Sequence, residues 1–147
     1  MVLRNKPGTY LLQLELKLEK SIRIGRLGVL SFPAGYYLYV GSAFGPGGLK
    51  ARISRHLRPN KRCRWHIDYL RRHCHLAEIW VSESPITMEC KWARFLSEHS
   101  RLSIPHASFG SSDCRCLSHL FHHPEYLDPQ SFNLESIRYF KPSDWHG

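Results

Sequence analysis

Residues 35–66 combine several features that proteins use to hold a phosphate group. Residues 36–40 are aromatic or apolar, which is typical of a strand. The next residues, 41–48, include four glycines, so the backbone can turn tightly there and approach a ligand closely. From Leu49 onward apolar residues recur at helical spacing. The polar residues expected on the adjoining face of this helix are Arg52, Arg55 and His56. A strand, a glycine loop and a basic helix in this order predict a phosphate partner at the end of a sheet.

Positive charge is concentrated in the same part of the chain. The 147 residues carry a net charge of +9, and the window from Lys50 to Arg72 has nine Lys or Arg against one acid, Asp68, which gives +8. Charge of one sign beside a glycine loop favours a polyanion, by default nucleic acid, over an acidic protein or a membrane surface. The residues expected to contact nucleic acid are Lys50, Arg52, Arg55, Arg58, Lys61, Arg62 and Arg64.

Hydrolysis of a phosphodiester would need more than a basic surface. A water must lose its proton, charge on the phosphoryl oxygens must be neutralised, and the leaving oxygen must be stabilised. Mg²⁺ binds through only one or two carboxylates together with substrate phosphate and water, so a single carboxylate is sufficient. Because the basic window contains one acid, that carboxylate is expected from elsewhere in the chain.

Two tripeptides give the chain a family resemblance. Gly8-Thr9-Tyr10 and Tyr39-Val40-Gly41, followed by Leu49-Lys50-Ala51-Arg52 and a glutamate that opens a later helix, resemble the signature of the GIY-YIG nuclease superfamily. From about Gly8 to Phe121 the chain is similar to a small, largely uncharacterised prokaryotic branch of that superfamily. The resemblance implies a metal-dependent endonuclease that hydrolyses DNA phosphodiester bonds, one strand per active site, in DNA repair or processing.

The resemblance also implies roles for individual residues. Glu89 would bind Mg²⁺ or Mn²⁺, Arg52 would contact the phosphate, and Tyr10 or Tyr39 would act as general base. His56 would shuttle a proton or hydrogen-bond the phosphate. The residues expected to support them are Gly41, Ser42, His66, Asp113 and His119. The alternative interpretations are a first-turn glutamate favoured by the helix dipole, a surface arginine and packed strand tyrosines. Many family members have an asparagine about a dozen residues after the glutamate, where this chain has Arg101.

The five cysteines are too scattered for the disulfide framework of a small secreted protein, and reduced thiols are expected. The segment from Cys114 to His119 could be read as part of a zinc site, with His122 or His123 as a further ligand. However, Cys114 and Cys116 are one residue apart, unlike common zinc motifs, and no second cysteine pair accompanies them. Structural thiols are therefore the favoured interpretation.

Alternation of apolar residues predicts a strand over 8–18 with one buried and one wet face. The other predicted strands are 21–24, 29–32, 36–40 and 77–82, and the predicted helices start at 49, 65 and 88. The first four strands are expected to form antiparallel hairpins, because their connections are too short for parallel crossovers. The hairpin over 21–32 lengthens the connection between the two tripeptides relative to the family.

These patterns predict an α/β protein of the α+β type: a small, mainly antiparallel sheet flanked by helices, with an extra β-hairpin. The predicted domain spans residues 1–123, and 124–147 are expected as a C-terminal extension. We expect a cytoplasmic protein, because the chain shows neither a membrane-length apolar run nor a signal peptide. DNA is the expected partner, and no small-molecule cofactor is expected. The alternatives are a nucleic-acid-binding module with weak or lost catalysis, and a zinc-stabilised adaptor that binds protein.

Overall fold

A computed structural model describes residues 5–111 and 114–144. Its centre is a five-stranded sheet in the order β6-β4-β1-β5-β7, in which every neighbouring pair is antiparallel. These strands are β1 (Thr9–Leu16), β4 (Gly35–Ser42), β5 (His75–Ser82), β6 (Leu120–His123) and β7 (Arg138–Phe140). The expected class, a mainly antiparallel sheet flanked by helices, is confirmed.

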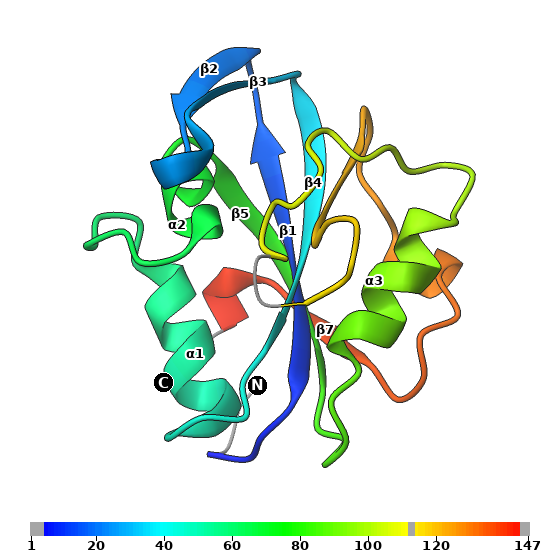
Figure 1. Cartoon of the computed structure of the whole chain (residues 1–147). Coiled ribbons are helices and arrows are strands. Elements are labelled where there is room, and N and C mark those ends of the chain that lie inside the picture. The colour runs from blue at the N-terminus through cyan, green and yellow to red at the C-terminus, as the bar shows by residue number, and fades with distance from the viewer. Residues whose placement is uncertain (1–4, 112–113, 145–147) are drawn as a thin grey trace.

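Helices cover both faces of the sheet (Figure 1). On one face lie α1 (Gly48–Leu57) and α2 (His66–Arg71), and on the other lies α3 (Glu89–Ser97). Consequently β1 is buried along both faces, and the expectation of one wet face is wrong. Its even-numbered residues pack against α1 and α2, whereas Leu11 packs with Trp80 and Trp92 in a second core beneath α3. No helix of the described residues is long and apolar enough to cross a membrane.

The predicted extra hairpin is present as a separate two-stranded sheet. It consists of β2 (Lys20–Arg23) and β3 (Val29–Phe32), joined through a short 3-10 turn, Gly25–Leu27. The expectation that the first strands pair in successive hairpins is therefore wrong for β1, which pairs with β4 and not with β2. The hairpin lies in the connection from β1 to β4 and outside the main sheet, so it does not disturb the register of these two strands.

The C-terminal segment completes the sheet. Strand β7 pairs with β5 at the sheet edge, and Leu127 and Phe132 are buried in the core beneath α3. The side chain of Gln13, in the middle of β1, donates to the Leu127 carbonyl at 2.9 Å and accepts from the Leu127 amide at 2.8 Å. Glu78 on β5 lies beside it and accepts hydrogen bonds from the Trp80 indole and the Tyr126 hydroxyl. A polar network within the apolar core thus joins residues 126–127 to the central strands.

Candidate functional site

Pairing of β1 with β4 brings the two signature tripeptides side by side. Tyr10 lies opposite Gly41, and Leu12 lies opposite Tyr39. Because residues two apart on a strand share a face, the two tyrosines are diagonal neighbours on the face that packs against α1. Next to them is a pocket of about 230 Å³ lined by Tyr10, Tyr39, Gly41, Ser42, Arg52, Trp65, Glu89, Gly110, Cys114 and His119. Four of the five predicted catalytic residues meet in this pocket, which we call the tyrosine pocket.

Gly41 is required by the way Tyr10 lies on the sheet. A Cβ atom at position 41 would overlap the Tyr10 ring and its hydroxyl oxygen. Cross-strand neighbours on one face approach to about 5 Å, so a large ring can lie across the strand only where its partner lacks a side chain. Gly41 therefore allows the Tyr10 hydroxyl to reach the tyrosine pocket.

The fifth predicted catalytic residue, His56, lies directly behind Tyr10. Its Nε2 is 2.7 Å from the Tyr10 hydroxyl oxygen, and its side chain is buried on the inner face of α1. Burial lowers the pKa of His56 to about 3, so the ring is neutral and forms a hydrogen bond with the Tyr10 hydroxyl. Burial also raises the pKa of Tyr10 well above its ordinary value, against the opposing effect of Arg52. His56 therefore orients the Tyr10 hydroxyl, and it is too deeply buried to contact a phosphate.

Arg52 is held at the rim of the tyrosine pocket by two contacts. Its Nη1 donates to the Ser42 carbonyl at 2.9 Å, and its guanidinium carbon lies 4.5 Å from the centre of the Trp65 ring. The guanidinium carbons of Arg55 and Arg64 also lie over this ring, at 4.2 and 5.4 Å. Trp65 is thus a stacking platform that fixes three cations beside the pocket. Trp65 was not among the predicted site residues, although an aromatic residue inside a run of arginines is a signal for such stacking.

Glu89 reaches the pocket from the other side of the sheet, at the first turn of α3. The amide of Met88 donates to Thr9 Oγ1 at 2.9 Å, which ties the start of the helix to β1. The carboxylate then lies between two polar groups: Ser42 Oγ donates to Oε1 at 2.9 Å, and His119 Nδ1 is 3.1 Å from Oε2. The His119 contact is close but poorly aligned, since Nδ1 has no partner with hydrogen-bond geometry among the described residues.

The charge state of Glu89 follows from these neighbours. Burial alone would raise the pKa of this carboxyl, but the contacts with His119 and Ser42 and the charge of Arg52 together lower it below its ordinary value. The side chain is 27% exposed, so water and a ligand can reach it. A half-buried, ionised carboxylate facing an arginine and two tyrosines can bind a divalent cation through oxygen.

Part of the basic window is used inside the protein. Arg55 forms two hydrogen bonds of 2.8 Å with the buried carboxylate of Asp68, and Lys61 Nζ lies 4.0 Å from the same group. Arg71 is buried and donates to backbone carbonyls at the end of α1. These cations have roles within the fold, and contact of the partly exposed Arg55 and Lys61 with nucleic acid stays a prediction. The exposed basic residues of the predicted interface are Lys50, Arg58, Arg62 and Arg64.

The glycine loop lines a pocket of about 300 Å³ together with Arg52, Arg55 and Arg64. Gly47 and Gly48 have positive φ angles of 83° and 58°, and a Cβ at Gly48 would overlap the carbonyls of Asn5 and Lys6. Moreover, the Leu49 amide near the start of α1 donates to the Lys6 carbonyl. Gly48 is therefore explained by tight packing against the N-terminal segment, whereas nothing lies near a Cβ atom at Gly45.

The remaining predicted residues are placed differently. His66 does not line the tyrosine pocket, but its Nδ1 accepts a hydrogen bond from the amide of Gly110, which does. Asp113 lies outside the described residues. Arg101, at the position of the family asparagine, is exposed and does not line the pocket. His119 is buried and lines it, as expected of a supporting residue.

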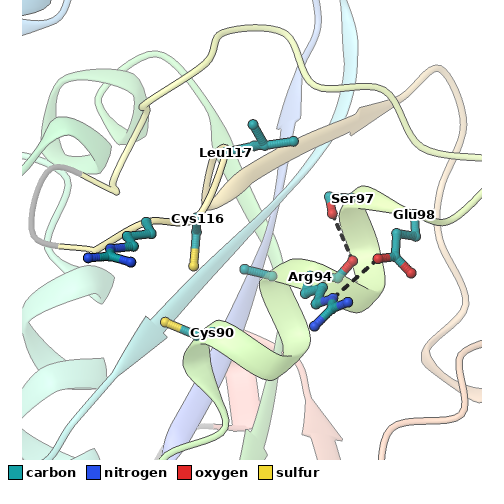
Figure 2. A pocket seen from close by; sticks show the side chains of 8 residues that line it. Cys90, Arg94, Ser97, Glu98, Cys116 and Leu117 are labelled. Atoms are coloured by element: carbon teal, nitrogen blue, oxygen red, sulfur yellow. Dashed lines mark hydrogen bonds and ion pairs between the residues drawn. The ribbon is translucent and has the colours of Figure 1, made fainter.

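A second cluster adjoins the first. Cys90 of α3, Cys114, Cys116 and His119 place one ligand atom each within 4.8 Å of one another, a set that could hold a metal ion. Figure 2 shows Cys90 and Cys116 pointing into one pocket between α3 and the segment before β6. Burial and the neighbouring thiols raise the pKa of Cys116 to about 12. No second cysteine pair accompanies Cys114 and Cys116, but a single cysteine, Cys90, joins them from 24 residues earlier in the chain. No sequence spacing indicated that contact.

The alternative ligands considered from sequence lie elsewhere. His122 Nε2 is 3.0 Å from the Ala34 carbonyl oxygen, and His123 contacts the backbone of Glu125. Both residues lie on β6, which begins just after His119, and they pair with Tyr37 and Tyr36 of β4. Neither belongs to the cysteine cluster.

The fold and the two clusters define a small α+β protein with a polar pocket and a candidate metal centre. The family model that matches the chain covers residues 9–141, which include every strand of the main sheet, and the chain belongs to the family described as domain of unknown function DUF123. Comparisons with curated proteins and with solved structures found no significant match.

Proposed function

We propose that this protein is a divalent-metal-dependent endonuclease that hydrolyses DNA phosphodiester bonds, as the resemblance to GIY-YIG nucleases implies. The observation that carries the proposal is the convergence of Tyr10, Tyr39, Arg52 and Glu89 on one polar pocket. These side chains come from two strands and two helices, and only the tertiary fold brings them together. Their types match the three requirements of phosphodiester hydrolysis: a proton acceptor, a fixed positive charge and a carboxylate for a cation.

Each residue has a role that its contacts support. Glu89 would hold Mg²⁺ or Mn²⁺, which when bound supplies positive charge to the phosphate and an acidified water. Arg52, already oriented by Trp65 and the Ser42 carbonyl, would donate its remaining N–H groups to the phosphoryl oxygens. Ser42 would orient the Glu89 carboxylate through its hydroxyl.

The Tyr10–His56 pair supports assigning the base to Tyr10. In a hydrogen bond from the Tyr10 hydroxyl to the neutral Nε2 of His56, 2.7 Å away, the phenol oxygen would keep its lone pairs available to the attacking water. Tyr39 has no comparable hydrogen-bond partner among the described residues; its ring lies beside that of His56 at a centroid distance of 6.3 Å. We therefore propose Tyr39 as a residue that shapes the pocket and contacts the phosphate.

A plasmid-nicking assay with Mg²⁺ or Mn²⁺ tests the proposal, with Glu89→Gln as the decisive variant. The amide preserves the shape and the Ser42 contact but removes the charge that binds the cation, so nicking should fall by about 10²–10⁴-fold. DNA affinity should stay level or rise, because a negative charge facing the phosphate is lost. Glu98→Gln is the matched control, since Glu98 is exposed near the other end of α3 and, among the described residues, its side chain pairs only with Arg94. It should nick at the wild-type rate.

Two outcomes would contradict the proposal. If Glu89→Gln nicks as fast as the wild type in protein free of contaminating nuclease, the carboxylate assignment is wrong. If the wild-type protein binds DNA tightly but nicks no substrate with either metal, the binding-module alternative is favoured. A screen over duplex, flap, bubble, abasic and single-stranded DNA makes the second result informative.

A further inference from the structure

We propose that Cys90, Cys114, Cys116 and His119 form a structural zinc site. The four donors come from three separate places, namely the first turn of α3, the loop at 114–116 and the residue just before β6. The family resemblance does not enter this inference, which concerns residues that the proposed nuclease chemistry does not use as a metal ligand. It therefore stands or falls separately from the proposed function.

The spacing of the donor atoms fits a tetrahedral ion. In a zinc site with Zn–S near 2.3 Å and Zn–N near 2.0–2.1 Å, neighbouring S and N ligands lie about 3.6 Å apart and two S ligands about 3.8 Å apart. Cys114 Sγ and His119 Nε2 are 3.4 Å apart, and all four ligand atoms lie within 4.8 Å of one another. The distance between the two most separated ligand atoms thus needs to shorten by at most about 1 Å. Rotation of the exposed Cys90 side chain can supply this change.

The donor chemistry selects zinc over the cation proposed for Glu89. Three thiols and one imidazole are soft or borderline ligands, which favour Zn²⁺, whereas Mg²⁺ and Mn²⁺ prefer oxygen. Three Cys and one His make a closed four-coordinate set, the type found in structural sites, without a position for water or substrate. Binding releases the thiol protons, since the thiolate is the ligand.

His119 is oriented for this role by both of its ring nitrogens. Nε2 faces the Cys114 sulfur, and Nδ1 lies 3.1 Å from Glu89 Oε2. Metal-binding histidines usually donate their second N–H to a carboxylate or carbonyl, which fixes the tautomer. A small rotation of the ring on coordination would turn the close Nδ1–Oε2 approach into such a hydrogen bond.

The site would fasten α3 to the segment that precedes β6. Its ligands link α3, on one face of the sheet, to the segment that runs along β4, where the Val40 amide donates to the His119 carbonyl. Cys90 follows Glu89 directly, so the same ion would fix the first turn of α3. Loss of the ion should therefore loosen this part of the protein while the cores on both faces of the sheet remain packed.

The metal content of purified protein tests the inference directly. Protein prepared anaerobically with a non-thiol reductant should contain about one zinc per chain, as measured by inductively coupled plasma mass spectrometry. Titration with an organomercurial should release that zinc, measured with a chromogenic chelator, as the thiols react. Cys90→Ser should reduce the zinc content to less than about a tenth of wild type, because a three-ligand thiol site binds far more weakly. Cys63→Ser is the matched control, since Cys63 is a partly exposed thiol outside the cluster, and it should retain the metal.

Cobalt provides a second readout that does not depend on how the protein was grown. Zinc-free protein reconstituted with Co²⁺ should show thiolate charge-transfer absorption and the intense visible bands of a tetrahedral site, and Cys90→Ser should lose them. Protein that contains no zinc and gives no such spectrum would overturn the proposal. A disulfide among Cys90, Cys114 and Cys116 in freshly isolated zinc-free protein would also overturn it. Such a disulfide is detected as a mass lower by two hydrogen atoms. Zinc retained equally by Cys90→Ser would show that the ion binds elsewhere.

Discussion

The hydroxyl oxygen of Tyr10 lies 2.7 Å from Nε2 of His56, and both side chains are almost entirely buried. The pair joins the central strand β1 to the inner face of α1. One member lines the tyrosine pocket and the other lies behind it, so their hydrogen bond fixes the orientation of the Tyr10 hydroxyl at the pocket.

This relationship separates the two tyrosines. If Tyr10 is the base, Tyr10→Phe should lower the nicking rate by about 10²–10⁴-fold. Tyr39→Phe should cost about tenfold or less, since it removes only a contact to the phosphate. Single-turnover rates at saturating enzyme measure the difference free of binding effects. The reverse order of the two variants would assign the base to Tyr39.

His56 makes stability depend on pH. Its pKa is about 3 in the folded protein but near 6.5 in an unfolded chain. As the pH falls below about 6.5, the unfolded chain takes up a proton at His56 that the folded protein does not. Stability should therefore fall between pH 6.5 and 3, by up to about 1.4 kcal/mol per pH unit from this group.

His56→Gln tests that dependence, because an amide can still form a hydrogen bond with the Tyr10 hydroxyl but does not titrate. Urea unfolding at pH 7.5, 6.5 and 5.5 should show a smaller loss of stability in the variant than in the wild type. Between pH 7.5 and 8.5, where His56 is neutral in both states, the two proteins should change in parallel. Equal slopes over the whole range would contradict the assignment.

Asp68 should be a structural carboxylate. Besides its two bonds to Arg55, it accepts hydrogen bonds from the Arg64 and Trp65 amides at the start of α2. Burial alone would raise its pKa, but these bonds and the Arg55 charge lower it to about 2. Asp68→Asn should cost about 2–4 kcal/mol at pH 7. The difference from wild type should persist down to about pH 4 and shrink as the pH falls toward 2. Glu135→Gln, an exposed substitution, should change the unfolding free energy by less than about 0.5 kcal/mol.

DNA affinity should depend on salt through the exposed cations. If Lys50, Arg58, Arg62 and Arg64 contact phosphates together with Arg52, log affinity should fall with log salt at a slope of about −4 to −5. Arg62→Ala should reduce the slope by about one, whereas Arg94→Ala, on the opposite face, should leave it unchanged. Fluorescence anisotropy with a short duplex from 50 to 300 mM salt would measure it, and affinity that barely changes over this range would contradict the interface.

Local sequence patterns predicted the central elements well. Strands β1, β4 and β5 and the three helices lie within a few residues of the predicted ranges, because alternation and helical spacing are strong in long segments. The edge strands β6 and β7, with four and three residues, were missed because segments this short have no measurable period.

The candidate site was predictable only in part, for a related reason. Tyr10, Tyr39, Arg52 and Glu89 were found through a resemblance that carries tertiary information. Contacts formed by the fold of this chain alone, such as Cys90 with Cys116, leave no trace in local spacing. Charge counting likewise treated Arg55 as free, since composition does not show that Asp68 is folded against it.

The Gln13–Leu127 contact has a consequence for how the sheet chooses its alignment. An apolar β1 could slide along β4 and β5 with little change in contact area, because leucines on both faces would still meet apolar neighbours. A shift by one residue would carry Gln13 to the face beneath α1 and α2 and leave its amide without the Leu127 backbone groups. The Gln13 side chain thus makes a single strand alignment favourable, and with it the placement of Tyr10 opposite Gly41.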